Sequence, residues 1–272
     1  MGERTPRVVI LAGGLGTRMR EETEFRPKPL VLIGNRPILW HIMKLYSCHG
    51  FNRFVICLGY KGEMIKDYFL NYDVMNNDLT IRLGREKQIE IHSARDEHDW
   101  EVTLVDTGLH TMTAARVKHV ERFIDTEDFL LTYGDGVADV DVTALVDFHR
   151  GHGRAATITG VWPPSRFGEL LVEGKQVVEF AEKPHVHRGG LINGGFFVMS
   201  RRVFRYLDDD PGSMLERGPL ERLARDSELM VYQHHGFWQC MDTLRDVALL
   251  GELWESGKAP WNVWDRHGEP RA

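Results

Sequence analysis

The chain has 272 residues, of which 42% are apolar and 27% are charged, and this is the composition of an ordinary soluble globular protein. Its length fits one large domain or two small ones and allows most of the surface to be buried on folding. The formal net charge of −6, from 34 basic and 40 acidic residues, argues against a uniformly cationic surface for nucleic acid, although it leaves room for a small basic pocket.

Apolar strands alternate with amphipathic helices along the first 150 residues. Residues 7–12 form a continuous β-branched and aliphatic run, which is typical of a strand buried on both faces. Pro37 begins a segment with helical spacing of apolar residues that ends near Gly50. Further strands are expected over 54–59, 102–106 and 129–133, and further helices over 63–72, 114–124 and 142–149. This alternation predicts a mostly parallel sheet covered by helices, with ligands bound beyond the carboxyl ends of the strands.

The pattern changes from residue 155 onward. Short strands are expected over 155–161, 169–172, 176–179 and 191–200, and a C-terminal helix over 244–254. The predicted fold class is therefore α/β: a Rossmann-like, mostly parallel sheet flanked by helices, with a smaller antiparallel β extension and a C-terminal helix. The polar stretch 73–99 is weakly periodic, which leaves open a two-stranded excursion or an arm that contacts a partner.

A glycine-rich turn, Gly-Gly-Leu-Gly-Thr-Arg at residues 13–18, follows the first strand directly. Successive backbone N–H groups in such a turn can cradle an anion, and Thr17 and Arg18 add donors for phosphate oxygens. The turn is not a dinucleotide fingerprint, because Met19 stands where the third glycine is needed, and no Gly-Lys pair completes a P-loop. The alternative is a tight strand-to-helix turn that needs glycine only for its backbone angles.

Lys28 lies between Pro27 and Pro29, which restrict the backbone on both sides of it. A rigid loop that presents one amine suits a site for polyphosphate charge. The alternative is a surface lysine in a polyproline II turn.

Several segments together resemble the sugar-phosphate nucleotidyltransferases. The segments are LAGGLGTR at 11–18 with PKP at 27–29, YGDGV at 133–137, FAEKP at 180–184 and INGGFF at 192–197. Three others resemble the branch of that family that transfers cytidylyl groups to glucose 1-phosphate: PILWHIM at 37–43, TLVDTG at 103–108 and FWQCMDT at 237–243. The matching segments are collinear and cover nearly the whole chain.

The resemblance implies an enzyme that joins CTP to α-D-glucose 1-phosphate, giving CDP-glucose for deoxysugar biosynthesis and releasing pyrophosphate. It also implies Mg²⁺ as the cofactor and a homo-oligomeric assembly. No Pro-, Gly- or Ser-rich linker marks a boundary, so one nucleotidyltransferase domain is expected over 1–272. Its nucleotide-binding part would span about 1–150 and its sugar-binding part about 151–272.

The resemblance also assigns roles to individual residues. Lys28 and Arg18 would be the catalytic cations that neutralise the triphosphate and the departing pyrophosphate. Asp135 ends an apolar strand and offers hard oxygen ligands for Mg²⁺, and Asp242 is implied as the second ligand, with N-capping of the C-terminal helix as its alternative. Nucleotide contacts are implied for Leu11, Ala12, Gly13, Gly14, Gly16, Thr17, Thr111, Arg116 and Gly134. Sugar-phosphate contacts are implied for Glu182, Lys183 and Asn193; the alternatives are an ordinary ion pair, an exposed lysine and a turn residue.

The identity of the base is the least constrained part of this prediction. An arginine such as Arg116 can donate to O2 of cytosine or of uracil, so UTP and dTTP stay open as substrates. Ala114 and Ala115 precede Arg116 where this branch often has glycines. A uridylyl- or thymidylyltransferase and a non-catalytic nucleotide-binding relative are therefore the alternatives.

Three widely spaced cysteines, Cys48, Cys57 and Cys240, argue against a disulfide framework and for a reducing compartment. The N-terminal apolar stretch is too short for a signal peptide or a membrane span. A cytoplasmic protein that binds neither nucleic acid nor membrane is therefore expected.

Overall fold

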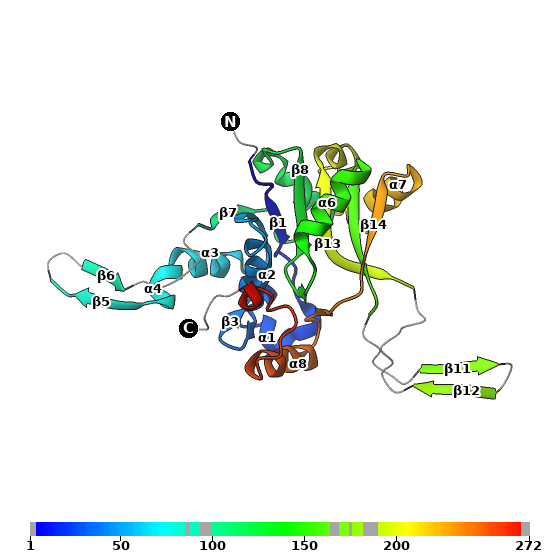
Figure 1. The fold of residues 1–272 in the computed structure, drawn as a ribbon. Helices are drawn as coiled ribbons and strands as arrows, with labels where there is room; N and C mark the ends of the chain where they lie inside the picture. The colour runs from blue at the N-terminus through cyan, green and yellow to red at the C-terminus, as the bar shows by residue number, and fades with distance from the viewer. Residues whose placement is uncertain are drawn as a thin grey trace.

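A seven-stranded sheet lies at the centre of the protein (Figure 1). The computed structural model describes residues 4–84, 88–92, 99–163, 169–173, 176–181 and 190–267. The strand order is β14-β10-β13-β8-β1-β4-β7. The strands span Val8–Leu11 (β1), Arg53–Leu58 (β4), Glu101–Asp106 (β7), Asp128–Tyr133 (β8), Ala156–Val161 (β10), Ile192–Ser200 (β13) and Leu229–His234 (β14).

Strand β1 is central, with β4 on one side and β8 on the other, and both neighbours are parallel to it. The chain runs from β1 to β4 and β7 and then crosses back to β8, so the strand order reverses between β1 and β8. Open α/β sheets bind ligands at such a point, beyond the carboxyl ends of the strands. Strand β13 is antiparallel to both β8 and β10. The predicted mostly parallel sheet is confirmed, and β14 is a strand that the sequence pattern did not reveal.

Helices cover both faces of the sheet, because successive side chains of each strand point to opposite faces. Val8 and Ile10 of β1 pack into a core that includes residues of α2, α6 and α8, whereas Val9 and Leu11 pack into a second core with α5 and α7. The helices span Arg20–Thr23 (α1), Ile38–Ser47 (α2), Gly62–Leu70 (α3), Tyr72–Asn76 (α4), Thr113–His119 (α5), Val142–His152 (α6), Pro219–Arg225 (α7) and Leu244–Glu255 (α8).

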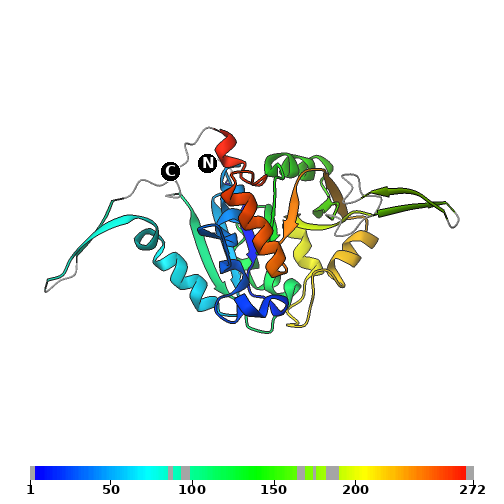
Figure 2. The same ribbon diagram turned by 90° about the horizontal axis from the view of Figure 1, so that it is seen from below.

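Two hairpins project from opposite ends of the sheet, as Figures 1 and 2 show. One joins β5 (Asp78–Arg82) to β6 (Gln88–His92), and the other joins β11 (Glu169–Glu173) to β12 (Gln176–Ala181). The first confirms a two-stranded excursion within 73–99, and its contact with a partner stays a prediction. Two further pairs are short: β2 (Leu32–Ile33) with β3 (Arg36–Pro37), and β9 (Gly136–Ala138) with β15 (Trp238–Cys240). Within the described ranges, no helix is long and apolar enough to cross a membrane.

A buried histidine joins α2 to the C-terminal segment. His41 is fully buried; its Nε2 donates to the Ile33 carbonyl at 3.1 Å, and the indole Nε1 of Trp261 donates to its Nδ1 at 3.3 Å. Nδ1 can accept only when it carries no proton, so this geometry requires the neutral ring. Burial lowers the pKa of His41 to about 4.

His41 should make stability depend on pH below neutrality. Because its folded pKa is lower than its unfolded value, the unfolded chain binds the extra proton first, and stability falls as pH drops from about 6.5 to about 4. The full loss in the free energy of unfolding over this pH range is about 3 kcal/mol. Urea unfolding of wild type and His41→Gln at pH 6.5 and 4.5 measures it. Equal losses of stability in the two proteins would contradict this role.

Candidate active site

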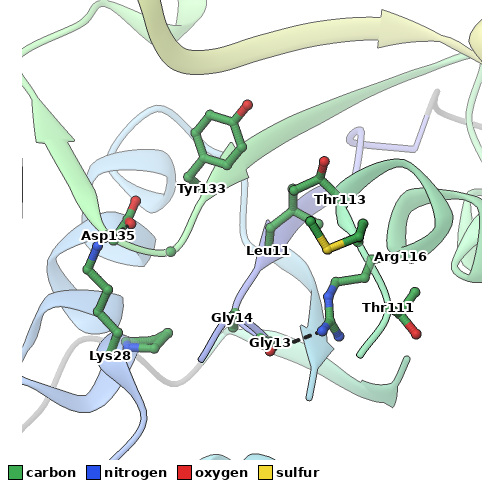
Figure 3. Close-up of a pocket in the computed structure, with 13 residues that line it drawn as sticks. Leu11, Gly13, Gly14, Lys28, Thr111, Thr113, Arg116, Tyr133 and Asp135 are labelled. Atoms are coloured by element: carbon green, nitrogen blue, oxygen red, sulfur yellow. Dashed lines mark hydrogen bonds and ion pairs between the residues drawn. The ribbon is translucent and has the colours of Figure 1, made fainter. Parts of the chain in front are cut away.

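A cavity of about 240 Å³ opens at the carboxyl ends of β1 and β8 (Figure 3). Its walls come from the loop after β1, the short turn Lys28–Leu30 (the Lys28 turn), the start of α5 and the end of β8. The lining residues are Leu11, Ala12, Gly13, Gly14, Lys28, Pro29, Thr111, Met112, Thr113, Arg116, Tyr133, Gly134 and Asp135. Nine of the residues predicted from the sequence are in this set.

Glycine is required at two of the lining positions because other atoms approach closely. A Cβ on Gly13 would lie 2.2 Å from a guanidinium nitrogen of Arg116, and a Cβ on Gly134 would lie 2.8 Å from the Leu11 carbonyl oxygen. Within the described part of the chain, the N–H groups of Gly13 and Gly14 donate to no protein acceptor. They are therefore available to an anion.

Arg116 is buried beneath this loop, where it binds backbone. Its guanidinium donates to the carbonyls of Leu58 at 2.9 Å and Gly13 at 3.0 Å, and to the Thr107 hydroxyl at 2.6 Å. Figure 3 shows the contact with Gly13. Arg116 thus joins the ends of β1, β4 and β7. Binding of the base by this residue stays a prediction.

A short ladder brings together two carboxylates that are far apart in the sequence. Strand β9 pairs with β15 so that Gly136 lies opposite Cys240, and the Met241 N–H donates to the Asp135 carbonyl at 2.8 Å. Asp135 and Asp242 therefore lie beside each other. Asp242 is not the N-cap of α8: Thr243 is that cap, in a capping box with Asp246.

The Lys28 ammonium lies between these two carboxylates. Its Nζ is 2.6 Å from Asp135 Oδ2 and 2.7 Å from Asp242 Oδ1, and its side chain is only 12% exposed. Burial alone would lower the pKa of Lys28, but the two carboxylates outweigh it and raise that pKa above its usual value. The alternative of a surface lysine is therefore wrong.

Arg18 completes the cluster from the outside. Its guanidinium is 2.7 Å from Asp242 Oδ2, and 75% of its side chain is exposed. Burial opposes ionisation of Asp242, yet Lys28 and Arg18 together hold the pKa of this carboxyl below its usual range. Arg18 and Asp242 do not line the cavity. Asp242 contacts Lys28, which does line it, and Arg18 is linked to the cavity through Asp242.

The two carboxylates fit a hard divalent cation. Mg²⁺ takes one or two protein carboxylates and completes its shell with water and phosphate oxygens. Asp135 and Asp242 lie beside each other at the cavity and share the Lys28 ammonium, and the described residues contain no group of three or more acidic, His or Cys ligands. This donor set suits a metal that arrives with a polyphosphate.

A hydrogen-bonded network, which the sequence motifs did not reveal, borders the other end of the cavity. The Tyr133 hydroxyl donates to Glu216 at 2.5 Å and accepts from the Asn193 amide at 3.1 Å. Tyr133 could have been found from the sequence, because it precedes Gly134 and Asp135 directly. Glu216 lies in a segment with no recognisable motif, so only the fold reveals it.

The remaining predicted site residues fall in three places. Gly16 and Thr17 do not line the cavity: Gly16 ends the loop after β1, and Thr17, which is exposed, begins the short 3-10 helix Thr17–Met19. Asn193 reaches the cavity through Tyr133. Glu182 and Lys183 lie outside the described residues.

Comparison with known proteins assigns this site to a family. The profile described as "Nucleotidyl transferase" matches residues 7–243. The chain belongs to the nucleotidyl transferase family. This match covers the loop after β1, the Lys28 turn, Asp135 and Asp242.

Individual nucleotidyl transferases resemble the chain to different degrees. Glucose-1-phosphate cytidylyltransferase of Salmonella typhi is 53% identical over 260 residues, which are 95% of this chain and 100% of that protein. UDP-glucose pyrophosphorylase in complex with UDP-glucose superposes with a TM-score of 0.67 at 14% identity, over 93% of this chain and 100% of the other. HddC from Yersinia pseudotuberculosis gives 0.65 at 22% identity, over 92% and 100%. These two structures share the fold.

Removal of the Lys28 charge should destabilise this nucleotidyl transferase fold. Lys28→Met leaves two carboxylates facing each other without a cation between them, and we expect a loss of about 1–3 kcal/mol in the free energy of unfolding. Arg18→Met is the matched control: its ion pair is exposed, so the loss should stay below about 0.5 kcal/mol. Urea unfolding without divalent cations measures both, and equal losses would contradict the bridging role.

Proposed function

We propose that the protein transfers a cytidylyl group from CTP to α-D-glucose 1-phosphate, producing CDP-glucose and pyrophosphate. The observation that carries this proposal is the convergence of Asp135 and Asp242 on Lys28, next to unpaired loop N–H groups at the sheet edge. Such a cluster suits the joining of two polyanions. The choice of CTP and glucose 1-phosphate is supported by the Salmonella relative, which carries that name and is 53% identical.

The reaction needs positioning and charge neutralisation more than a covalent nucleophile. An oxygen of the sugar phosphate attacks the α-phosphorus of the nucleotide, and the bond to pyrophosphate breaks. Two of the three N–H donors of Lys28 are used by the carboxylates, so the third is available to a phosphate oxygen. Arg18, which is largely exposed, can bind the departing pyrophosphate.

Mg²⁺ is the proposed cofactor, held by Asp135 and Asp242. When bound, it supplies positive charge to the phosphate oxygens. The loop N–H groups of Gly13 and Gly14, which also line the cavity, would bind the same polyphosphate. Lys28 holds the two carboxylates side by side.

The two substrates occupy different ends of the proposed site. Thr111 and Arg116, at the end near α5, are proposed to face the nucleotide. Asn193 is proposed to bind a sugar hydroxyl, together with Glu182 and Lys183. We further propose one catalytic domain over 1–272, a homo-oligomer, and a cytoplasmic location. The described cysteines form no disulfide, which supports that location.

The proposed activity is tested by pyrophosphate release from a matrix of CTP, UTP and dTTP against several sugar 1-phosphates. We expect release only when nucleotide and sugar phosphate are both present, with CTP and glucose 1-phosphate the fastest pair. Faster turnover of UTP or dTTP would show that uracil or thymine, and not cytosine, is the preferred base. No release from any pair would favour a non-catalytic nucleotide-binding protein.

Asp135→Asn should weaken the dependence on magnesium. The amide keeps the size of the side chain but removes its charge, so the Mg²⁺ concentration for half-maximal activity should rise at least about tenfold. Asp147→Asn makes the same change at an exposed position on α6 that does not line the cavity, and should leave the titration unchanged. An unchanged titration for Asp135→Asn would reject this residue as a ligand.

A further inference from the structure

Glu216 receives hydrogen bonds from two residues of the cavity wall, although it is not itself part of that wall. Tyr133 donates to its Oε1 at 2.5 Å, and Thr113 donates to its Oε2 at 2.8 Å. Thr113 begins α5, and Tyr133 ends β8. In Figure 3 the hydroxyls of both residues point away from Lys28 and Gly13. Glu216 therefore connects two walls of the cavity from behind.

The segment that carries Glu216 is itself attached to the start of α5. The Pro211 carbonyl accepts from the Met112 N–H at 2.8 Å, and the Ser213 carbonyl accepts from the Ala114 N–H at 3.1 Å. The Leu215 N–H donates to the Thr113 hydroxyl at 2.8 Å. Because these contacts lie within the five residues that precede Glu216, they fix the segment that carries its carboxylate against the start of α5.

The carboxylate also fixes the direction of a chain of hydrogen bonds. An ionised carboxylate can only accept, so the single proton of the Tyr133 hydroxyl points to Glu216. The Tyr133 oxygen can then only accept, and it accepts from Asn193 Nδ2 at 3.1 Å. The other end of the amide agrees, because the Gly195 N–H donates to Asn193 Oδ1 at 2.8 Å. Both ends thus require the same orientation of the Asn193 amide.

This orientation leaves one donor of Asn193 for a ligand. Its amide has two N–H groups, and Tyr133 takes one of them. Among the described residues, no other acceptor bonds this amide nitrogen. A hydroxyl oxygen of a sugar can accept the second N–H, whereas a flipped amide would present its carbonyl oxygen at that position.

We propose that Glu216 is a positioning residue for the sugar phosphate: through Tyr133, and together with the Gly195 N–H, it fixes the Asn193 amide with an N–H directed to a sugar hydroxyl. This inference rests on the proposed function, in which Asn193 binds the sugar. Glu216 acts through other side chains and does not touch the reacting atoms.

The test is Glu216→Gln in the full-length enzyme. Glutamine has nearly the same shape but can donate as well as accept, so it no longer fixes the direction of the Tyr133 proton. We expect KM for glucose 1-phosphate to rise about tenfold, with KM for CTP changed less than about twofold. Glu221→Gln, the same change at an exposed position on α7, should alter neither KM.

A double-mutant cycle with Tyr133→Phe tests the route. Because the proposed coupling runs through the Tyr133 hydroxyl, Glu216→Gln should add less than about twofold to KM for glucose 1-phosphate in the Tyr133→Phe background. A full tenfold effect in that background would overturn the proposal. So would equal increases in both KM values with a lower melting temperature, which would indicate a purely structural role.

Failure of the proposed function is distinguishable from failure of this inference. If Asn193→Ala leaves KM for glucose 1-phosphate unchanged, the sugar role of Asn193 is wrong and the inference falls with it. If Asn193→Ala raises this KM but Glu216→Gln does not, only the inference is wrong. If the nucleotide matrix shows no turnover, calorimetric binding of glucose 1-phosphate to the same variants replaces KM.

Discussion

The ammonium of Lys28 makes it possible for Asp135 and Asp242 to lie side by side. Two carboxylates that are close enough to contact one ammonium repel each other, and partial burial of the site strengthens that repulsion. The lysine removes it with two contacts of 2.6 and 2.7 Å. Three elements build this arrangement. The β9–β15 ladder positions the two carboxylates, the proline-flanked turn positions Lys28, and the segment after β1 provides Arg18 and the N–H donors around the cluster.

Long buried elements were predictable from the sequence, whereas short pairings were not. The run at 7–12 is apolar on both faces, and β1 contributes to both cores, so its position followed from composition alone. Strands β9 and β15 have three residues each, too few for a periodic pattern to be visible. Strand β14 pairs only with β10 at the sheet edge, and its Met230 and Val231 are partly exposed.

Some residues of the candidate site were likewise predictable from the sequence, and others were not. Lys28, Asp135 and the glycine loop were recognisable because their motifs are local in sequence. The backbone partners of Arg116 and the role of Glu216 depend on contacts between residues that are 58 to 103 positions apart. Chemistry that is assembled from distant segments leaves no local signal, so the fold was needed to reveal it.

The distance along the chain between the members of the charged cluster has a consequence for biosynthesis. Lys28 and Asp242 are 214 residues apart, and Trp261 bonds His41 from 220 residues away. The first half of the chain emerges from the ribosome long before Asp242 and Trp261 are synthesised. The growing polypeptide therefore holds an incomplete charged cluster until the C-terminal segment emerges, and a product truncated before Asp242 would lack both that carboxylate and the contact of Trp261 with His41.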